Sequence, residues 1–97
     1  MIHVAPIKID GKVAMGLKVE LPDSPPLLIV VGRTGFVMCG FLNMEATEKL
    51  NVAAATVSGV KTFEDVLQAE VKAVTSKAEM KGVKPGMSGK EAVKLLL

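Results

Sequence analysis

Hydrophobic and polar residues alternate in the first quarter of the chain, which is the pattern of a β-strand with one apolar face. From position 12 to position 21 the apolar side chains are Val13, Met15, Leu17, Val19 and Leu21. The preceding apolar run, residues 2–9, is separated from this segment by Asp10-Gly11, a dipeptide that favours a two-residue hairpin turn. The pattern therefore predicts an antiparallel hairpin over residues 2–21.

Both faces of this hairpin carry apolar groups. A two-residue turn places Ile2, Val4 and Pro6 opposite Val19, Leu17 and Met15, and leaves Ile7, Ile9, Ala14 and Gly16 on the other face. Pro6 has no backbone donor, so it belongs at an edge, a strand end or a bulge. We expect residues 2–21 to be the region of self-association, with an interface formed by Val13, Met15, Leu17 and Val19.

The next segment predicts a second hairpin. Residues 21–26 include three prolines and cannot continue a ladder of hydrogen bonds. Two short apolar runs follow, residues 27–31 and 36–39, and Gly32-Arg33-Thr34-Gly35 joins them. Runs of this length and composition are typical of buried strands, so we expect a buried central hairpin.

Short helices follow, each with a sequence signal at its start. Asn43 can cap a helix over 44–50, and residues 52–57 form a small, β-branched run suited to a strand. Thr62 with Asp65 resembles a capping box, and so does Ser88 with Glu91 before a helix over 92–97. Between them, residues 63–78 fit either one long helix or a short helix, a strand near 71–74 and a helix capped by Thr75.

These elements predict an α+β fold, in which short helices pack on a mixed, mainly antiparallel sheet that begins with the N-terminal hairpin. With 97 residues and no linker-like segment, we expect a single domain over residues 1–97. Hydrophobic residues make up 49% of the chain, and about 58% when glycine is included, against about 45–50% in ordinary soluble domains. This surplus predicts a homo-oligomer.

Other partners are disfavoured by composition and charge. No apolar run approaches the roughly 18 residues of a membrane span. The net charge of +2 comes from scattered lysines, and there is no Trp or Tyr to stack on bases, so we do not expect nucleic-acid binding. The first residues do not resemble a signal peptide and there is one cysteine, so we expect a cytoplasmic protein.

The run Val37-Met38-Cys39-Gly40-Phe41-Leu42 resembles the YunC-like family of bacterial and archaeal proteins, whose function is unknown. The resemblance extends to Val19–Pro22, Ser58–Thr62 and Gly82–Ala92, and so spans nearly the whole chain. It implies a small α/β domain that forms a tetramer through its N-terminal β region, and it favours a strand after residue 68. It brings no established catalytic residues.

The candidate site is centred on Cys39, the only thiol, at the end of a predicted strand and close to a helix start that can lower a thiol pKa. Gly40 and Asn43 at this junction are candidate ligand-binding residues, because glycine permits close approach and a helix start presents free N–H groups. A structural cysteine, a tight turn and an ordinary helix cap are the more common explanations of the same residues.

Arg33, the only arginine, is a further candidate for contact with an anion. His3, the only possible imidazole base, has no spacing that ties it to Cys39. One Cys and one His cannot form a structural zinc site, and no motif indicates a cofactor. Two functions stay open: an oligomeric binding or assembly module for an unknown ligand, or a small enzyme built around Cys39, Gly40 and Asn43.

Overall fold

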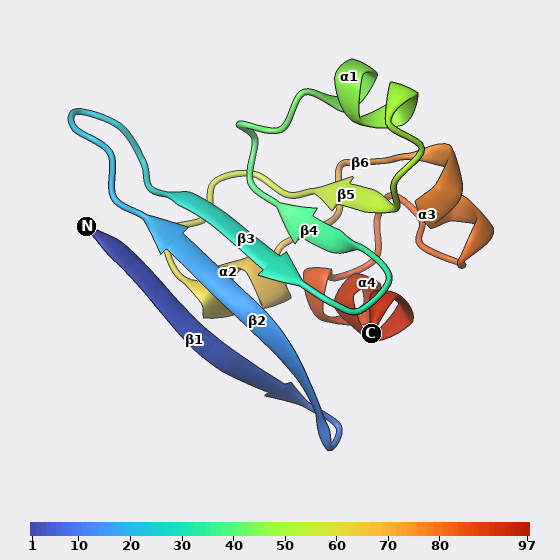
Figure 1. Ribbon diagram of the computed structural model, residues 1–97, viewed down its shortest axis with the longest axis horizontal. Coiled ribbons are helices and arrows are strands. Elements are labelled where there is room, and N and C mark those ends of the chain that lie inside the picture. The colour runs from blue at the N-terminus through green and yellow to red at the C-terminus, as the bar shows by residue number, and fades with distance from the viewer.

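The backbone forms a six-stranded sheet in which the strand order follows the order of the chain (Figure 1). The computed structural model describes all 97 residues. The strands are β1 (Ile2–Ile9), β2 (Lys12–Val19), β3 (Leu27–Val31), β4 (Phe36–Met38), β5 (Ala54–Thr56) and β6 (Ala73–Val74). The helices are α1 (Met44–Lys49), α2 (Phe63–Gln68), α3 (Ser76–Met80) and α4 (Gly89–Leu96). Every pair of neighbouring strands is antiparallel except β4 and β5. The predicted α+β fold is confirmed.

The N-terminal hairpin has the predicted turn and the predicted register. Asp10 and Gly11 have φ angles of 50° and 81°, and positive values at both positions are what a tight hairpin turn requires. Ile2, Val4 and Pro6 lie opposite Val19, Leu17 and Met15, as the spacing indicated. The turn chemistry alone therefore determines which side chains share a face.

Pro6 occupies a position in β1 where the lack of a backbone N–H removes no hydrogen bond to β2. The N–H of Glu20 donates to the carbonyl of Met1 at 3.0 Å, which makes these two residues a hydrogen-bonded pair. Such pairs alternate along an antiparallel ladder, so the even-numbered residues of β1 direct their backbone groups to the free edge. Pro6 thus leaves the bonds to β2 intact and interrupts the donors along that edge.

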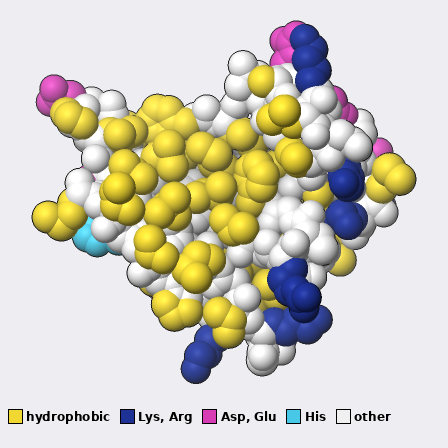
Figure 2. Space-filling view, viewed as in Figure 1, with side chains coloured by type: hydrophobic (Ala, Val, Ile, Leu, Met, Phe, Trp, Pro, Cys, Tyr) yellow, Lys and Arg dark blue, Asp and Glu magenta, His cyan; other side chains and the backbone are white.

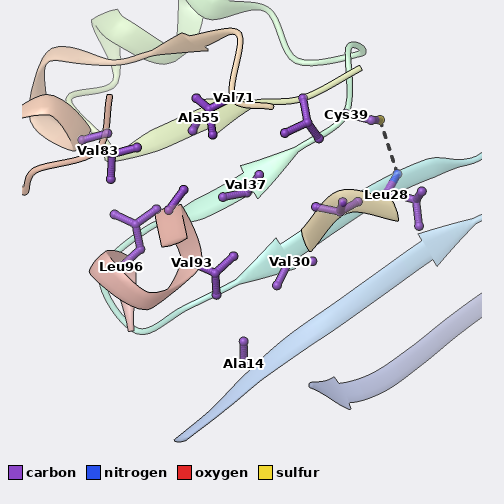
Figure 3. Close-up of a cluster of buried hydrophobic side chains, with 14 of the residues drawn as sticks. Ala14, Leu28, Val30, Val37, Cys39, Ala55, Val71, Val83, Val93 and Leu96 are labelled. Carbon is purple, nitrogen blue, oxygen red and sulfur yellow. Dashed lines mark hydrogen bonds between the residues drawn. The ribbon is translucent and has the colours of Figure 1, made fainter. Parts of the chain in front are cut away.

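The helices α2 and α4 pack together and cover one face of the sheet, where most of the core lies (Figures 1 and 3). Leu28, Val30 and Val37 are fully buried on this face. Gly16 makes room for the ring of Phe63, because a β-carbon at position 16 would lie 2.8 Å from it. The other face of the predicted central hairpin is only partly covered, and Val31 there is 39% exposed.

The second half of the chain settles the alternative between a long helix and a strand. Here α2 ends at Gln68, a short strand β6 follows, and Thr75 caps α3. The expected capping box of Thr62 and Asp65 is complete. Helix α4 begins at Gly89, slightly earlier than expected, and Ser88 Oγ accepts the N–H of Glu91 at 3.2 Å. None of these helices is long and apolar enough to cross a membrane.

Candidate functional site

A pocket lies beyond the carboxyl ends of the parallel strands β4 and β5. In these strands Phe36 lies opposite Ala54 and Met38 lies opposite Thr56. The connection through α1 carries the chain back to the end of the sheet where β4 begins, so that β5 runs in the same direction. The carboxyl ends of parallel strands share one edge, so the segments that follow them lie close together. Here these segments are 39–41 after β4 and 58–61 after β5.

This pocket has a volume of about 320 Å³ and a mostly apolar lining. Its walls come from Pro25-Pro26, from the segment 39–41 and from the segment 58–61. Lys61 is the only lysine, arginine or carboxylate in the lining. A second, smaller pocket of about 240 Å³ shares Pro26 and Lys61 with it and is also lined by Lys18 and Glu20. The two pockets therefore adjoin each other on either side of Lys61.

Cys39 lies at the floor of the first pocket and is 5% exposed. Its Sγ accepts the N–H of Leu28 at 3.4 Å, and its own N–H donates to the carbonyl of Leu28 at 3.0 Å (Figure 3). The carbonyl of Cys39 instead accepts the N–H of Leu42. The thiol thus replaces a backbone carbonyl as the last acceptor of the β3–β4 ladder, a structural role in addition to its place in the pocket.

The other predicted site residues are divided among three places. Gly40 lies beside Cys39 in the pocket, and a β-carbon there would meet nothing within 4 Å. Asn43 is not part of the lining, and its side-chain oxygen accepts the N–H of Ala46 at 3.1 Å as the cap of α1. Arg33 lies in the turn between β3 and β4, at the opposite end of this hairpin from Cys39, beside Lys12 and Leu97.

A hydrogen bond between two side chains lies next to the second pocket. Nε2 of His3 and Oε2 of Glu20 are 3.0 Å apart. The hydrogen bond with His3 holds the pKa of the Glu20 carboxyl below its ordinary value. The only histidine therefore contacts Glu20, whereas the Cys39 thiol is bonded to the backbone of Leu28. No group of three or more His, Cys, Asp or Glu side chains is placed to hold a metal ion.

Sequence reasoning located Cys39 and Gly40 but missed the other walls of the pocket. In the sequence, Pro25-Pro26 indicates only a break between strands, and Ser58-Gly59 simply follows the strand predicted over 52–57. The sequence does hold a signal for the wall formed by 58–61. When two parallel strands are joined through a helix, the loop after the second strand lies beside the loop after the first. That inference needs the parallel pairing of β4 and β5.

Residues 38–96 match the family model described as a domain of unknown function, DUF1805. The chain belongs to the DUF1805 family. Within this DUF1805 chain the matched segment includes both strand-end segments of the pocket, 39–41 and 58–61, and it begins after β1, β2 and β3.

Two further comparisons extend over almost the whole chain. The DUF1805 chain is 34% identical to the uncharacterized protein YunC of Bacillus subtilis (strain 168), over 96% of this chain and 95% of that relative. It is also similar to a crystal structure of a protein of unknown function from Thermoplasma acidophilum, with a TM-score of 0.94 and 37% identity. That match covers 100% of this chain and 94% of the other. The resemblance to YunC-like proteins is confirmed.

Proposed function

We propose that this chain is the subunit of a cytoplasmic homo-oligomer, a tetramer, that works as a binding or assembly module. The observation that carries the proposal is the outer face, defined as the sheet face opposite α2 and α4. Figure 2 views the molecule from this side and shows a broad, continuous hydrophobic surface over β1, β2 and β3. A surface of this kind on a small protein marks an interaction site.

The strand register identifies the residues of the outer face. Met15 pairs with Val31, and Leu17 pairs with Ile29, so apolar side chains stand in rows across neighbouring strands. The exposed fraction is 66% for Ile2, 61% for Val4 and 53% for Val13. The face comprises Ile2, Val4, Pro6, Val13, Met15, Leu17, Val19, Leu27, Ile29, Val31, Phe36 and Met38.

The size of this face suits a stable interface between two copies. Five of these residues are 39–66% exposed and the other seven are at least partly exposed, so the face presents on the order of 700 Å² per chain, compared with about 800 Å² that each partner buries in a standard interface. The patch exceeds the roughly 300–600 Å² that is usual for the largest patch of a monomer. A second copy of this chain therefore offers enough apolar area to cover it.

The nature of the surface favours a second copy over a different partner. Lys8 is the only charged residue on this side of β1 and β2, opposite Val13 at one end of the hairpin. An apolar patch with so little charge is complementary to itself, which is the requirement of an interface with two-fold symmetry. Pro6 interrupts the donors of the free β1 edge, so the contact we propose is between faces rather than edges.

The oligomer is tested by light scattering on wild-type protein and on Val4→Lys and Met15→Lys. Both side chains are exposed in the single chain, at 61% and 47%, so the substitutions should leave the fold intact and lower the mass below that of the wild-type tetramer. Met80→Lys is the matched control, because Met80 is 87% exposed on α3 and lies off this face. A wild-type protein that is monomeric at micromolar concentration contradicts the proposal.

A small enzyme that uses the Cys39 thiol is the second candidate, and the place of Cys39 in the lining of the pocket favours it. Only the thiolate is a strong nucleophile, so this candidate requires Cys39 to react quickly with iodoacetamide near neutral pH while the protein stays folded. Alkylation only after denaturation contradicts it. The free thiol also supports a reducing cytoplasm, which cell fractionation can test.

A further inference from the structure

The pocket at the ends of β4 and β5 combines an apolar chamber with a cationic exit. The chamber is lined by proline rings, by Phe41 and by Val60, and its volume of about 320 Å³ lies at the lower end of the range for small-molecule sites. Its lining holds no carboxylate. A small apolar group can therefore enter this space without removing a carboxylate from water.

Lys61 stands where the chamber meets the second pocket, and Lys18 lies in that second pocket. Neither lysine takes part in an ion pair within the chain. The only carboxylate there, Glu20, is already bonded to His3 at 3.0 Å. Two lysines next to one engaged carboxylate leave a net positive charge at the exit, which attracts an anion.

We propose that this composite pocket binds a small amphiphilic carboxylate, with its apolar body in the chamber beside Cys39 and its carboxylate between Lys61 and Lys18. The charged residues that line the two pockets, Lys18, Lys61 and Glu20, sum to one positive charge, which matches a monoanion better than a phosphate dianion. Arg33, which would suit a phosphate, lies at the other end of the hairpin. The chain length that fits is short, because the chamber is small. The proposal is independent of the oligomer.

The test is a titration of the isotope-labelled protein with octanoate, followed by amide NMR. Octanoate should shift the amides of Gly40, Phe41 and Gly59. Octanol, which has the same apolar body and no charge, should bind about three- to fivefold more weakly, which is the scale of one exposed ion pair. Inorganic phosphate alone should leave these amides unchanged.

Lys61→Gln should weaken octanoate binding by about three- to fivefold, and Lys61→Arg should preserve it. The fold should tolerate both changes, because the Lys61 side chain is exposed and only its backbone N–H bonds to Asp65. Lys84→Gln, an exposed lysine that lines neither pocket, is the control and should bind like the wild type.

A chemical readout checks the chamber itself. Octanoate should slow the modification of Cys39 by methyl methanethiosulfonate, because Cys39 is only 5% exposed and lines the pocket. Equal binding of octanol and octanoate, or shifts confined to outer-face residues such as Met15 and Val31, would overturn the proposal. Equal binding would show that the carboxylate contributes nothing to affinity. Shifts confined to the outer face would show that octanoate adsorbs to an apolar surface instead.

Discussion

Gly89 of α4 lies directly against the backbone of Val66 in α2. A β-carbon at position 89 would overlap the carbonyl oxygen of Val66, and the N–H of Gly89 donates to the carbonyl of Ala69 at 2.8 Å. Glycine is thus required at the start of α4 by the neighbouring helix, even though it is a poor helix former. This contact sets how closely the two helices pack on the sheet.

Gly89→Ala should therefore destabilise the protein by about 1–3 kcal/mol, the usual cost of overpacking. Helix propensity alone predicts the opposite sign, a gain of up to about 1 kcal/mol. Urea denaturation distinguishes the two. Gly40→Ala is the control, because its new β-carbon meets nothing within 4 Å, and it should change the stability little.

The hydroxyl of Thr75 makes three hydrogen bonds at a buried position. It donates to the carbonyl of Val52 at 2.7 Å and accepts the N–H groups of Ala54 at 3.0 Å and Ala78 at 3.3 Å. Thr75→Val keeps the shape but leaves these groups unpaired and removes the cap of α3, at a cost of about 2–4 kcal/mol. Thr75→Ser retains the hydroxyl and should lose clearly less in the same thermal melts.

Two adjacent leucines in α4 should differ strongly in their contributions to stability. Leu96 is fully buried and Leu95 is 42% exposed. Leu96→Ala leaves a cavity in the core and should cost about 2–5 kcal/mol, whereas Leu95→Ala should cost less than about 1 kcal/mol. Similar losses in both variants, measured by chemical denaturation, would show that α4 does not pack as described.

The ion pair between Asp10 and Lys94 makes part of the stability depend on pH. These side chains are 2.5 Å apart, and the hydrogen bond and charge of Lys94 lower the pKa of Asp10. The contribution is present above the unfolded value of about 3.9 and is lost as the pH falls through the lower folded value. Asp10→Asn tolerates the positive φ of the turn, and so removes only this contribution.

The corresponding measurement is the melting temperature of wild type and Asp10→Asn from pH 7 down to pH 2. The wild type should be the more stable of the two at neutral pH. The difference should shrink below about pH 4, where the Asp10 carboxyl of the unfolded chain begins to take up its proton. A difference that stays constant over the whole range contradicts a role for this ion pair.

Local chemistry explains which parts of the fold were predictable from sequence. The Asp10-Gly11 turn determines the register of β1 with β2, and the Thr62–Asp65 box marks the start of α2. In contrast, Val71 and Val74 fit helical and extended spacing equally well. Their conformation depends on pairing with distant segments: Val74 lies opposite Ala55 in β5, and the backbone of Val71 bonds to Met87 and Gly86. No neighbouring residue carries that information.

The residues of the candidate pocket were also only partly predictable, because long-range strand pairing brings most of them together. Cys39 and Gly40 are adjacent in sequence, so one motif identified both. Lys61 reaches the same pocket only because β4 and β5 pair in parallel through the crossover of α1. Asn43 looked equally suitable, but its side chain is occupied by the cap of α1. The sequence thus identified residues on one wall, and long-range pairing supplied the others.

The order of the strands has a consequence for synthesis on the ribosome. Each strand pairs with the one made just before it, so the sheet can extend in step with translation. Its inner face, however, is completed only by α4. Thr34 donates from both its N–H and its hydroxyl to the carbonyl of Leu96, 62 residues later. The nascent chain therefore carries an uncovered outer face and an incompletely covered inner face until α4 emerges, and a chaperone that binds apolar strands can bind it during that interval.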